Sequence, residues 1–463
     1  MRHVPPCLTA VWAAFAAILT LSSGPQAQAL GSPVQEEEAT APVAAPESSP
    51  ILIRAAKAVL SPGDERENVE ILIRGERIAA VGTGLAIPEG AQVIEAPMVT
   101  TGLIDSWSVL SVDSGSVNDS RGNPALSAVD GVDPYESAHL REDALAAGVT
   151  GLRVQAALNT RDGSQGAFLR NDPQLTLDGS VLSGSAGLGM VLPGGDPFQR
   201  VESVDRVFSL IDAGASYRRS QLKYAKDLAE WQQAIAEKTA ELEKDFKKAK
   251  KDRDKDVKEA EEEGDEFKEK KYKEDKKPKA PKFNGNNEVY ARVSTGALPL
   301  FVEAHRAVEI RNLLAKKSEY PQVRMYLVGA SDGHLFAEGL AEAAIGVVLT
   351  PGRRGGAYDV AELELAASLS AKGVEVLFGT GGAPSMVPDL PLLAAAAIGH
   401  GLGREAALHA LTLGPARAFD LNADLGSIAA GKVADLVVYS GDPFASTTRV
   451  QSVLLRGEVV LQR

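Results

Sequence analysis

Short alternating apolar runs near both ends of the chain predict β-strands. Turn residues such as Gly75-Glu76, Gly82 and Pro88-Glu89-Gly90 separate the early runs. Both ends show the same pattern, so we expect them to pair as one small composite β-sandwich. The runs cover residues 51–54, 69–73, 77–81, 93–94, 435–439 and 453–460.

The middle of the chain alternates apolar runs with helical patterns. The run 301–304 precedes a helical pattern over 306–317, and Gly148 ends a short helix before the run 149–155. Such alternation is typical of an α/β fold with a parallel sheet, and the length suits a (β/α)8 TIM-like barrel. Further apolar runs cover 325–328, 347–349 and 374–378, and helical patterns cover 336–344 and 360–372.

One segment, residues 218–282, breaks this alternation because Lys, Glu and Asp dominate it. Opposite charges interleave along it, which favours a solvated helical insert, a hairpin or a partly disordered excursion held by ion pairs four residues apart. The alternative is a partner-binding arm. The mixed signs lack the single-sign field that attracts nucleic acid.

The first 29 residues are typical of an export signal. Arg2 and His3 precede an apolar run over 8–21, and Ala27-Gln28-Ala29 forms a cleavage site. The alternative, a membrane anchor, is disfavoured because the run is short for a membrane span. We therefore expect a signal peptide over 1–29, a disordered linker over 30–49, a periplasmic or secreted protein and no membrane span after cleavage.

Composition narrows the partners and the chemistry. The 463 residues carry a formal net charge of −13, which disfavours nucleic acid as a partner. Hydrophobic residues make up 44%, enough for a sizeable core. Cys7 is the sole cysteine and lies within the predicted signal. The mature chain would therefore lack disulfides, thiol nucleophiles and cysteine-bound zinc.

Three motifs resemble the amidohydrolase superfamily, specifically its imidazolonepropionase-like exported branch. They are Thr101-Gly102-Leu103-Ile104-Asp105, the segment 147–154 (AGVTGLRV) and the tail with 403–408, 412–417 and 425–438. The resemblance implies a barrel over 101–420 that contains the charged insert 218–282. It also implies a β-sandwich built from 50–100 and 421–463.

The same resemblance implies a divalent metal, held first by a His-x-His pair after the first barrel strand. This sequence has Ser106 and Ser108 at that pair. The family's last ligand is an aspartate after the eighth strand, where this chain reads 378–385 without a carboxylate, with Gly381 at the ligand position. A neutral hydroxyl is a poor zinc ligand beside imidazole. The metal-ligand positions are therefore predicted to be degenerate.

Some candidate site residues remain. His305 matches the family's strand-5 histidine, and Glu303 lies two residues earlier, on the same face of a regular strand. These two are the catalytic candidates, with His305 also a remnant metal ligand and His334 a weak second one. The resemblance further suggests Asp105, Gln165 and Thr380 as residues that line the pocket.

The free energies that a metal ion and a single histidine can supply argue against the metal-assisted hydrolysis of the family. A catalytic zinc lowers the pKa of bound water from ~15.7 to ~7, worth about 12 kcal/mol. One positioned histidine base contributes about 3–5 kcal/mol. We therefore expect no cofactor, or one divalent metal, zinc first, if activity persists. Asp113, Asp119 and Asp130 are the alternative ligands in the loop after the first strand.

Three functions stay open. The first is an exported amidohydrolase-like protein that binds a small-molecule or peptide ligand at the barrel mouth without turnover. The second is an active hydrolase of carbon–nitrogen bonds, of the cyclic amide or peptide type, with a rearranged or mononuclear site around His305. The third is a non-catalytic assembly subunit that forms a homo-oligomer or docks onto an active paralogue.

Overall fold

A computed structural model of the chain describes residues 49–113, 122–133, 135, 138–156, 161–173, 177–192, 195–263, 276–354 and 357–463. The predicted signal peptide and all but residue 49 of the predicted linker lie outside these residues. Within the described ranges, no helix combines the length and the apolar character that a membrane crossing requires.

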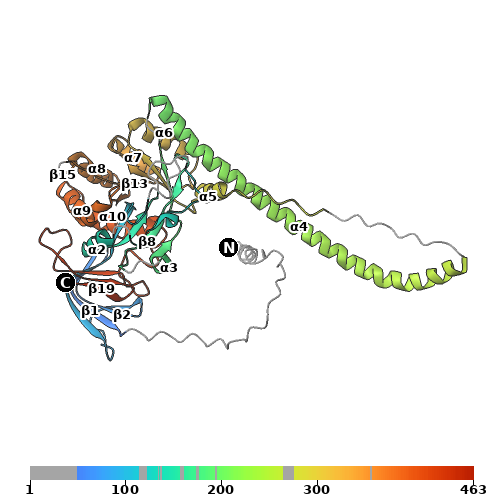
Figure 1. Cartoon of the computed structure of the whole chain (residues 1–463), viewed down its shortest axis with the longest axis horizontal. Helices are drawn as coiled ribbons and strands as arrows, with labels where there is room; N and C mark the ends of the chain where they lie inside the picture. The colour runs from blue at the N-terminus through green and yellow to red at the C-terminus, as the bar shows by residue number, and fades with distance from the viewer. Residues whose placement is uncertain are drawn as a thin grey trace, which may run out of the picture. The chain divides into compact units, whose positions relative to one another are not determined.

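Both ends of the chain build one seven-stranded sheet in the order β19-β18-β17-β4-β1-β2-β3. The central strand β4 pairs parallel with β1 and antiparallel with β17, so the predicted pairing of the two ends is confirmed. Figure 1 shows the blue N-terminal strands beside the red C-terminal ones. The strands are β1 (Ile51–Ser61), β2 (Asp64–Arg74), β3 (Arg77–Gly82), β4 (Gln92–Thr101), β17 (Leu436–Tyr439), β18 (Val450–Leu455) and β19 (Glu458–Gln462).

A buried ion pair joins this sheet to the rest of the fold. Asp435, just before β17, accepts a hydrogen bond from Arg170 Nε at 3.0 Å, and both side chains are buried. The other oxygen of Asp435 accepts the backbone N–H of Arg456 at 2.8 Å. Because each carboxylate oxygen has a donor, this buried charge is satisfied.

The middle of the chain forms the predicted parallel sheet. Its five parallel strands lie in the order β16-β13-β12-β11-β10. Their apolar residues are buried on both faces, as crossover helices require. The strands are β10 (Leu188–Val191), β11 (Leu300–Ala304), β12 (Met325–Gly329), β13 (Ile345–Leu349) and β16 (Val376–Phe378), and the helices between them include α6 (Ala307–Lys317), α7 (Ala337–Glu342) and α8 (Val360–Ala371).

The remaining strands of the central fold depart from simple alternation. β5 (Leu103–Ser108) and β6 (Val149–Val154) pair parallel, but β6 then pairs antiparallel with β8 (Ala167–Arg170). Two-residue β7 (Ser164–Gln165) pairs antiparallel with β10. The described strands therefore form two separate ladders, and hydrogen bonding alone does not close a barrel.

Shorter elements complete the described ranges. They are η2 (Ala128–Gly131), α2 (Ala138–Ala146), α3 (Leu177–Ser180), β9 (Val181–Ser183), η3 (Gly333–Phe336), β14 (Arg353–Arg354), β15 (Ala357–Tyr358), η4 (Pro384–Asp389), α9 (Leu390–Gly399), α10 (Arg404–Leu411) and α11 (Leu413–Ala418).

The charged insert belongs to a helix that begins earlier than predicted. α4 spans Pro197–Glu263, and its first turns bury Val204, Phe208 and Ile211 in the main core. From residue 218 to residue 238 no side chain is buried. The helix therefore starts as part of the fold, beside α5 (Gly285–Ser294), and continues into a polar, solvated stretch.

Candidate functional site

A cavity of about 370 Å³ opens where β10, β11 and β12 end. The carboxyl ends of parallel strands are where α/β folds assemble ligand sites. The lining residues are Val191, Leu192, Arg200, Glu303, His305, Arg306, Glu309 and Ser331.

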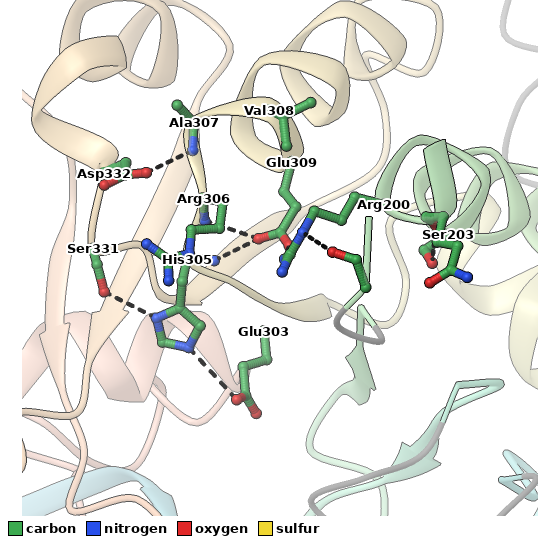
Figure 2. Close-up of polar contacts among 12 residues, drawn as sticks. Arg200, Ser203, Glu303, His305, Arg306, Ala307, Val308, Glu309, Ser331 and Asp332 are labelled. Carbon is green, nitrogen blue, oxygen red and sulfur yellow. Dashed lines mark hydrogen bonds and ion pairs between the residues drawn. The ribbon is translucent and has the colours of Figure 1, made fainter. Parts of the chain in front are cut away.

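His305 stands at the centre of this cavity's polar wall. Its Nδ1 lies 3.0 Å from Ser331 Oγ, and its Nε2 lies 3.6 Å from Glu303 Oε1. Figure 2 shows Ser331 and Glu303 on opposite sides of the imidazole ring. The Glu303 carboxylate raises the pKa of His305. At 3.6 Å the His305–Glu303 contact is longer than a hydrogen bond, and it is an ion pair when the imidazole is protonated.

Two carboxylates fix the backbone on which His305 stands. Glu309 Oε2 accepts the backbone N–H groups of His305 and Arg306, each at 2.9 Å. Asp332 Oδ2 accepts the N–H of Ala307 at 2.8 Å, and Arg200 pairs with the other oxygen of Glu309. These bonds satisfy the first turn of α6 and hold the imidazole in place (Figure 2).

The end of β5 is different, because its side chains are buried and no cavity opens there among those described. Ser106 and Ser108, at the positions where the resemblance implies metal ligands, have no exposed surface. Ser106 Oγ lacks any hydrogen-bond partner among the described residues, and Ser108 Oγ accepts the N–H of Leu110 at 3.3 Å. Between them, Trp107 is buried against Phe301, with ring centroids 5.9 Å apart.

Asp105, also fully buried, joins this packed region to the loop after β16. Its carboxylate accepts Thr380 Oγ1 at 2.5 Å and the N–H groups of Thr380 and Trp107, each at 3.1 Å. Gly381 N–H donates to the carbonyl of Trp107 at 2.8 Å. Burial raises the pKa of Asp105 to about 6 despite these donors. The contacts give Asp105, Thr380 and Gly381 a role in holding the loop.

A buried guanidinium completes the packed region. Arg153, at zero exposure, lies with its guanidinium carbon 4.2 Å from the Trp107 ring centre and 4.8 Å from that of Phe301. Its Nε donates to the carbonyl of Ala186 at 3.2 Å, and its two terminal nitrogens lack partners among the described residues. Burial lowers the pKa of Arg153 to about 9, so the group is a cation at neutral pH.

The donors present do not fit a divalent metal at the family position. Within the described ranges, no group of three or more His, Cys, Asp or Glu side chains gathers to hold an ion. The end of β5 offers the two serine hydroxyls, which are poor zinc ligands, and the carboxylate of Asp105, which already accepts three hydrogen bonds. His305 and Glu303 alone provide two donors.

The other predicted site residues lie elsewhere. Gln165 is buried, where its amide donates to the carbonyl of Pro124 and accepts from Ser185 Oγ. His334 is exposed in η3 and does not line the cavity. Asp130 accepts the backbone N–H of Ser127 in a helix cap, and Asp119 lies outside the described residues.

Sequence reasoning missed two residues of interest, Ser331 and Arg153. Ser331 is the centre of a G-x-S-x-G motif, Gly329-Ala330-Ser331-Asp332-Gly333, which could have been found from the sequence. Arg153 lies in a strand whose sequence carries no sign that its charge is buried.

Comparisons with known proteins support the family resemblance. Residues 337–461 match the sequence profile described as "Amidohydrolase family". The fold resembles an amidohydrolase from Thermotoga maritima MSB8 at a TM-score of 0.63 and 23% identity, covering 89% of this chain and 100% of that one. N-isopropylammelide isopropylaminohydrolase from Burkholderia multivorans ATCC 17616 matches at a TM-score of 0.49 and 17% identity, covering 90% and 99%.

No curated protein sequence matches the chain. The likeness to the Thermotoga structure shows a shared fold, and the profile match covers the C-terminal part of the chain. Taken with the motifs at 101–105 and 425–438, the profile match relates residues 337–461 to the amidohydrolase family, and the Thermotoga structure shows the shared fold.

Proposed function

We propose that this protein binds a small ligand in the His305 cavity and does not perform the metal-assisted hydrolysis of its superfamily. One observation carries the proposal. Ser106 and Ser108 are buried where the family resemblance implies metal-binding histidines. The guanidinium of Arg153 packs against the ring of Trp107, the residue between these two serines in the sequence. Buried neutral hydroxyls are poor ligands for a divalent cation.

The charges of the cavity indicate what the ligand carries. Arg306 lines the cavity, and no ion pair joins its guanidinium to a carboxylate of the described residues. Arg200 is already paired with Glu309. The Arg306 guanidinium therefore favours a ligand with a carboxylate or carbonyl oxygen as its polar end, and Val191 and Leu192 offer an apolar wall.

The test is metal loading of the purified chain. The protein is incubated with excess Zn²⁺ or Mn²⁺, freed of unbound ion by gel filtration and measured by elemental analysis. We expect far less than one equivalent of metal, unchanged in a His305→Ala variant. One tightly held equivalent in the wild type would overturn the proposal in favour of a mononuclear hydrolase.

We also infer that the two ladders of the central fold close into a (β/α)8 barrel, and that the composite sheet curls into a sandwich. The bond from Gly381 to Trp107 and the contact between Gln155 and Ser164 bridge the ladders at both seams. In the composite sheet, apolar residues of six strands gather in one cluster, which requires a curled sheet. An experimental structure would test both inferences.

We propose, finally, that the protein is exported and that its signal is removed. The support is the charged start, apolar run and cleavage site within 1–29. Intact mass of protein recovered from the periplasm or medium would test this, with a chain starting at Leu30 as the expected result. A full-length chain retained inside the cell would contradict it.

A further inference from the structure

The turn after β12 has the sequence and the context of a nucleophile elbow. In such an elbow, a G-x-S-x-G motif joins a strand to a helix through a strained turn and exposes the serine hydroxyl. Here β12 ends at Gly329, η3 begins at Gly333, and Ser331 between them is exposed at the cavity. Gly329 and Ala330 have φ values of +87° and +48°, and the positive φ at Ala330 marks local strain.

The fold brings a base to this serine. In the parallel pair β11–β12, Ala304 lies opposite Gly329, so His305 follows directly beside the turn. A Cβ added at Gly329 would lie 2.1 Å from His305 Cε1, which shows that the ring occupies the space a side chain would fill. The N–H of Asp332 donates to the carbonyl of His305 at 2.9 Å and fixes the two segments together.

The resulting row is Ser331, His305 and Glu303 (Figure 2), with distances of 3.0 Å and 3.6 Å. A nucleophile within hydrogen-bond reach of a base that a third group orients is the arrangement that activates serine. The roles of the ring nitrogens require the tautomer with its proton on Nε2, toward Glu303, which leaves Nδ1 free to accept from Ser331.

We propose that Ser331, His305 and Glu303 form a metal-independent acyl-transfer site for small esters or amides. The proposal deepens the proposed function, because it rests on the same ligand cavity and gives it covalent chemistry. Its volume of about 370 Å³ limits the substrate to a small molecule.

The chemistry balances without another reagent besides water. Ser331 Oγ attacks the substrate's carbonyl carbon while its proton passes to His305 Nδ1. The imidazolium then protonates the leaving alcohol or amine as the carbon–oxygen or carbon–nitrogen bond breaks. Water attacks the acyl-serine ester and gives a proton to His305, which returns it to Ser331 as the acid departs.

The donor for the oxyanion differs from the usual elbow. There, the backbone N–H of the residue after the serine stabilises the oxyanion. Here the N–H of Asp332 is engaged with His305. The guanidinium of Arg306 lines the same cavity and supplies the positive charge instead.

A small alkyl fluorophosphonate tests the proposal. Ser331 Oγ would bond to phosphorus and release fluoride, while the hydroxyl proton passes to His305. We expect the wild-type chain to gain one phosphonyl group by intact mass, mapped to Ser331 by peptide sequencing. Ser331→Ala should gain none, and His305→Asn should react at least ~100-fold more slowly.

Ser318→Ala is the matched control, because Ser318 is exposed after α6 and donates only to the carbonyl of Ala315. It should label at the wild-type rate, and equal thermal unfolding midpoints would show that all variants fold. An unlabelled wild type, an adduct at another residue, or unchanged labelling of Ser331→Ala or His305→Asn would each overturn the proposal. Metal loading measures the proposed function separately, so the two failures are distinguishable.

Discussion

The ends of β5 and β11 belong to one α/β fold, yet one is filled and the other is open. At β5, Ser106, Trp107 and Ser108 are buried, and the Arg153 cation stacks on the indole. At β11, Glu303 and His305 keep 31% and 44% of their side chains exposed beside a cavity. Titratable groups with solvent access and a polar partner can bind and react with a ligand, whereas buried, close-packed hydroxyls cannot be reached by one. The difference moves the candidate chemistry from the end of β5 to the ends of β11 and β12.

Asp105→Asn tests the buried end of β5 and has the largest expected effect. A carboxyl whose folded pKa is about 6, above its ordinary 3.8, favours the folded state at low pH. That stability is lost as pH rises from about 4 to about 6, because the folded state binds more protons than the unfolded chain there. The loss is about 3 kcal/mol.

Urea unfolding at pH 4, 5, 6 and 7 measures this. The wild type should lose that stability relative to Asp105→Asn as pH rises, while the exposed Asp143→Asn control should follow the wild type. Parallel pH profiles for wild type and Asp105→Asn would mean that Asp105 titrates normally.

Gly329→Ala tests the open side. The added Cβ would meet the His305 ring at 2.1 Å, in a backbone with φ of +87°. We expect fluorophosphonate labelling to slow by ~100-fold as His305 is displaced, with a stability loss of about 1–3 kcal/mol.

Gly333→Ala is the control within the same motif. A Cβ there would lie at ordinary contact distances, 3.4 Å from Ala330 Cβ and 3.8 and 3.9 Å from the side chains of Leu369 and Leu365, and no positive φ is required. It should keep near wild-type labelling. Equal rates for the Gly329 variant would show that the imidazole position is not limiting.

Arg153→Met returns to the filled side and should stabilise the fold. Methionine keeps most of the volume but removes a buried cation whose terminal nitrogens have no hydrogen-bond partner among the described residues. Replacing a buried charge with an apolar group of similar volume gains about 2 kcal/mol, even after the stacking on Trp107 is lost. Chemical denaturation measures the gain, and a net loss would show that the cation is satisfied in place.

Glu303→Gln has the smallest expected effect. The carboxylate is partly exposed and 3.6 Å from the ring, so solvent screens it. We expect about a tenfold slower labelling and a lower pKa of His305, because Glu303 is the main cause of its rise. Proton NMR of the imidazole follows the pKa. An unchanged titration would remove Glu303 from the row of three.

The periodicity of apolar residues predicted those elements that local sequence determines. The strands at both ends, the parallel sheet of β10 to β16 and the approach of Glu303 to His305 follow from spacing of two and from β-α alternation. The start of α4 at Pro197 was missed because the insert was recognised by its high density of charged residues. The first turns of α4 are buried and carry few charged residues.

Contacts between segments distant in the sequence determine the features that the sequence patterns did not predict. Arg153 is buried because aromatic rings from β5 and β11 meet over it, which its own strand does not encode. Short antiparallel β7 and β8 stand where simple alternation predicts a third parallel strand, and their two to four residues are too few for a period. The motif around Ser331 was visible, but its partner came from the preceding strand of the sheet.

The position of β4 between β1 and β17 has a consequence for biogenesis. One edge of β4 finds its partner only when residues 436–439 have been synthesised, near the end of the chain. During translation, the first four strands therefore carry an unpaired edge that is prone to aggregation. Such long-range closure is slow, so a nascent chain of this protein would depend on a chaperone until its last strands arrive.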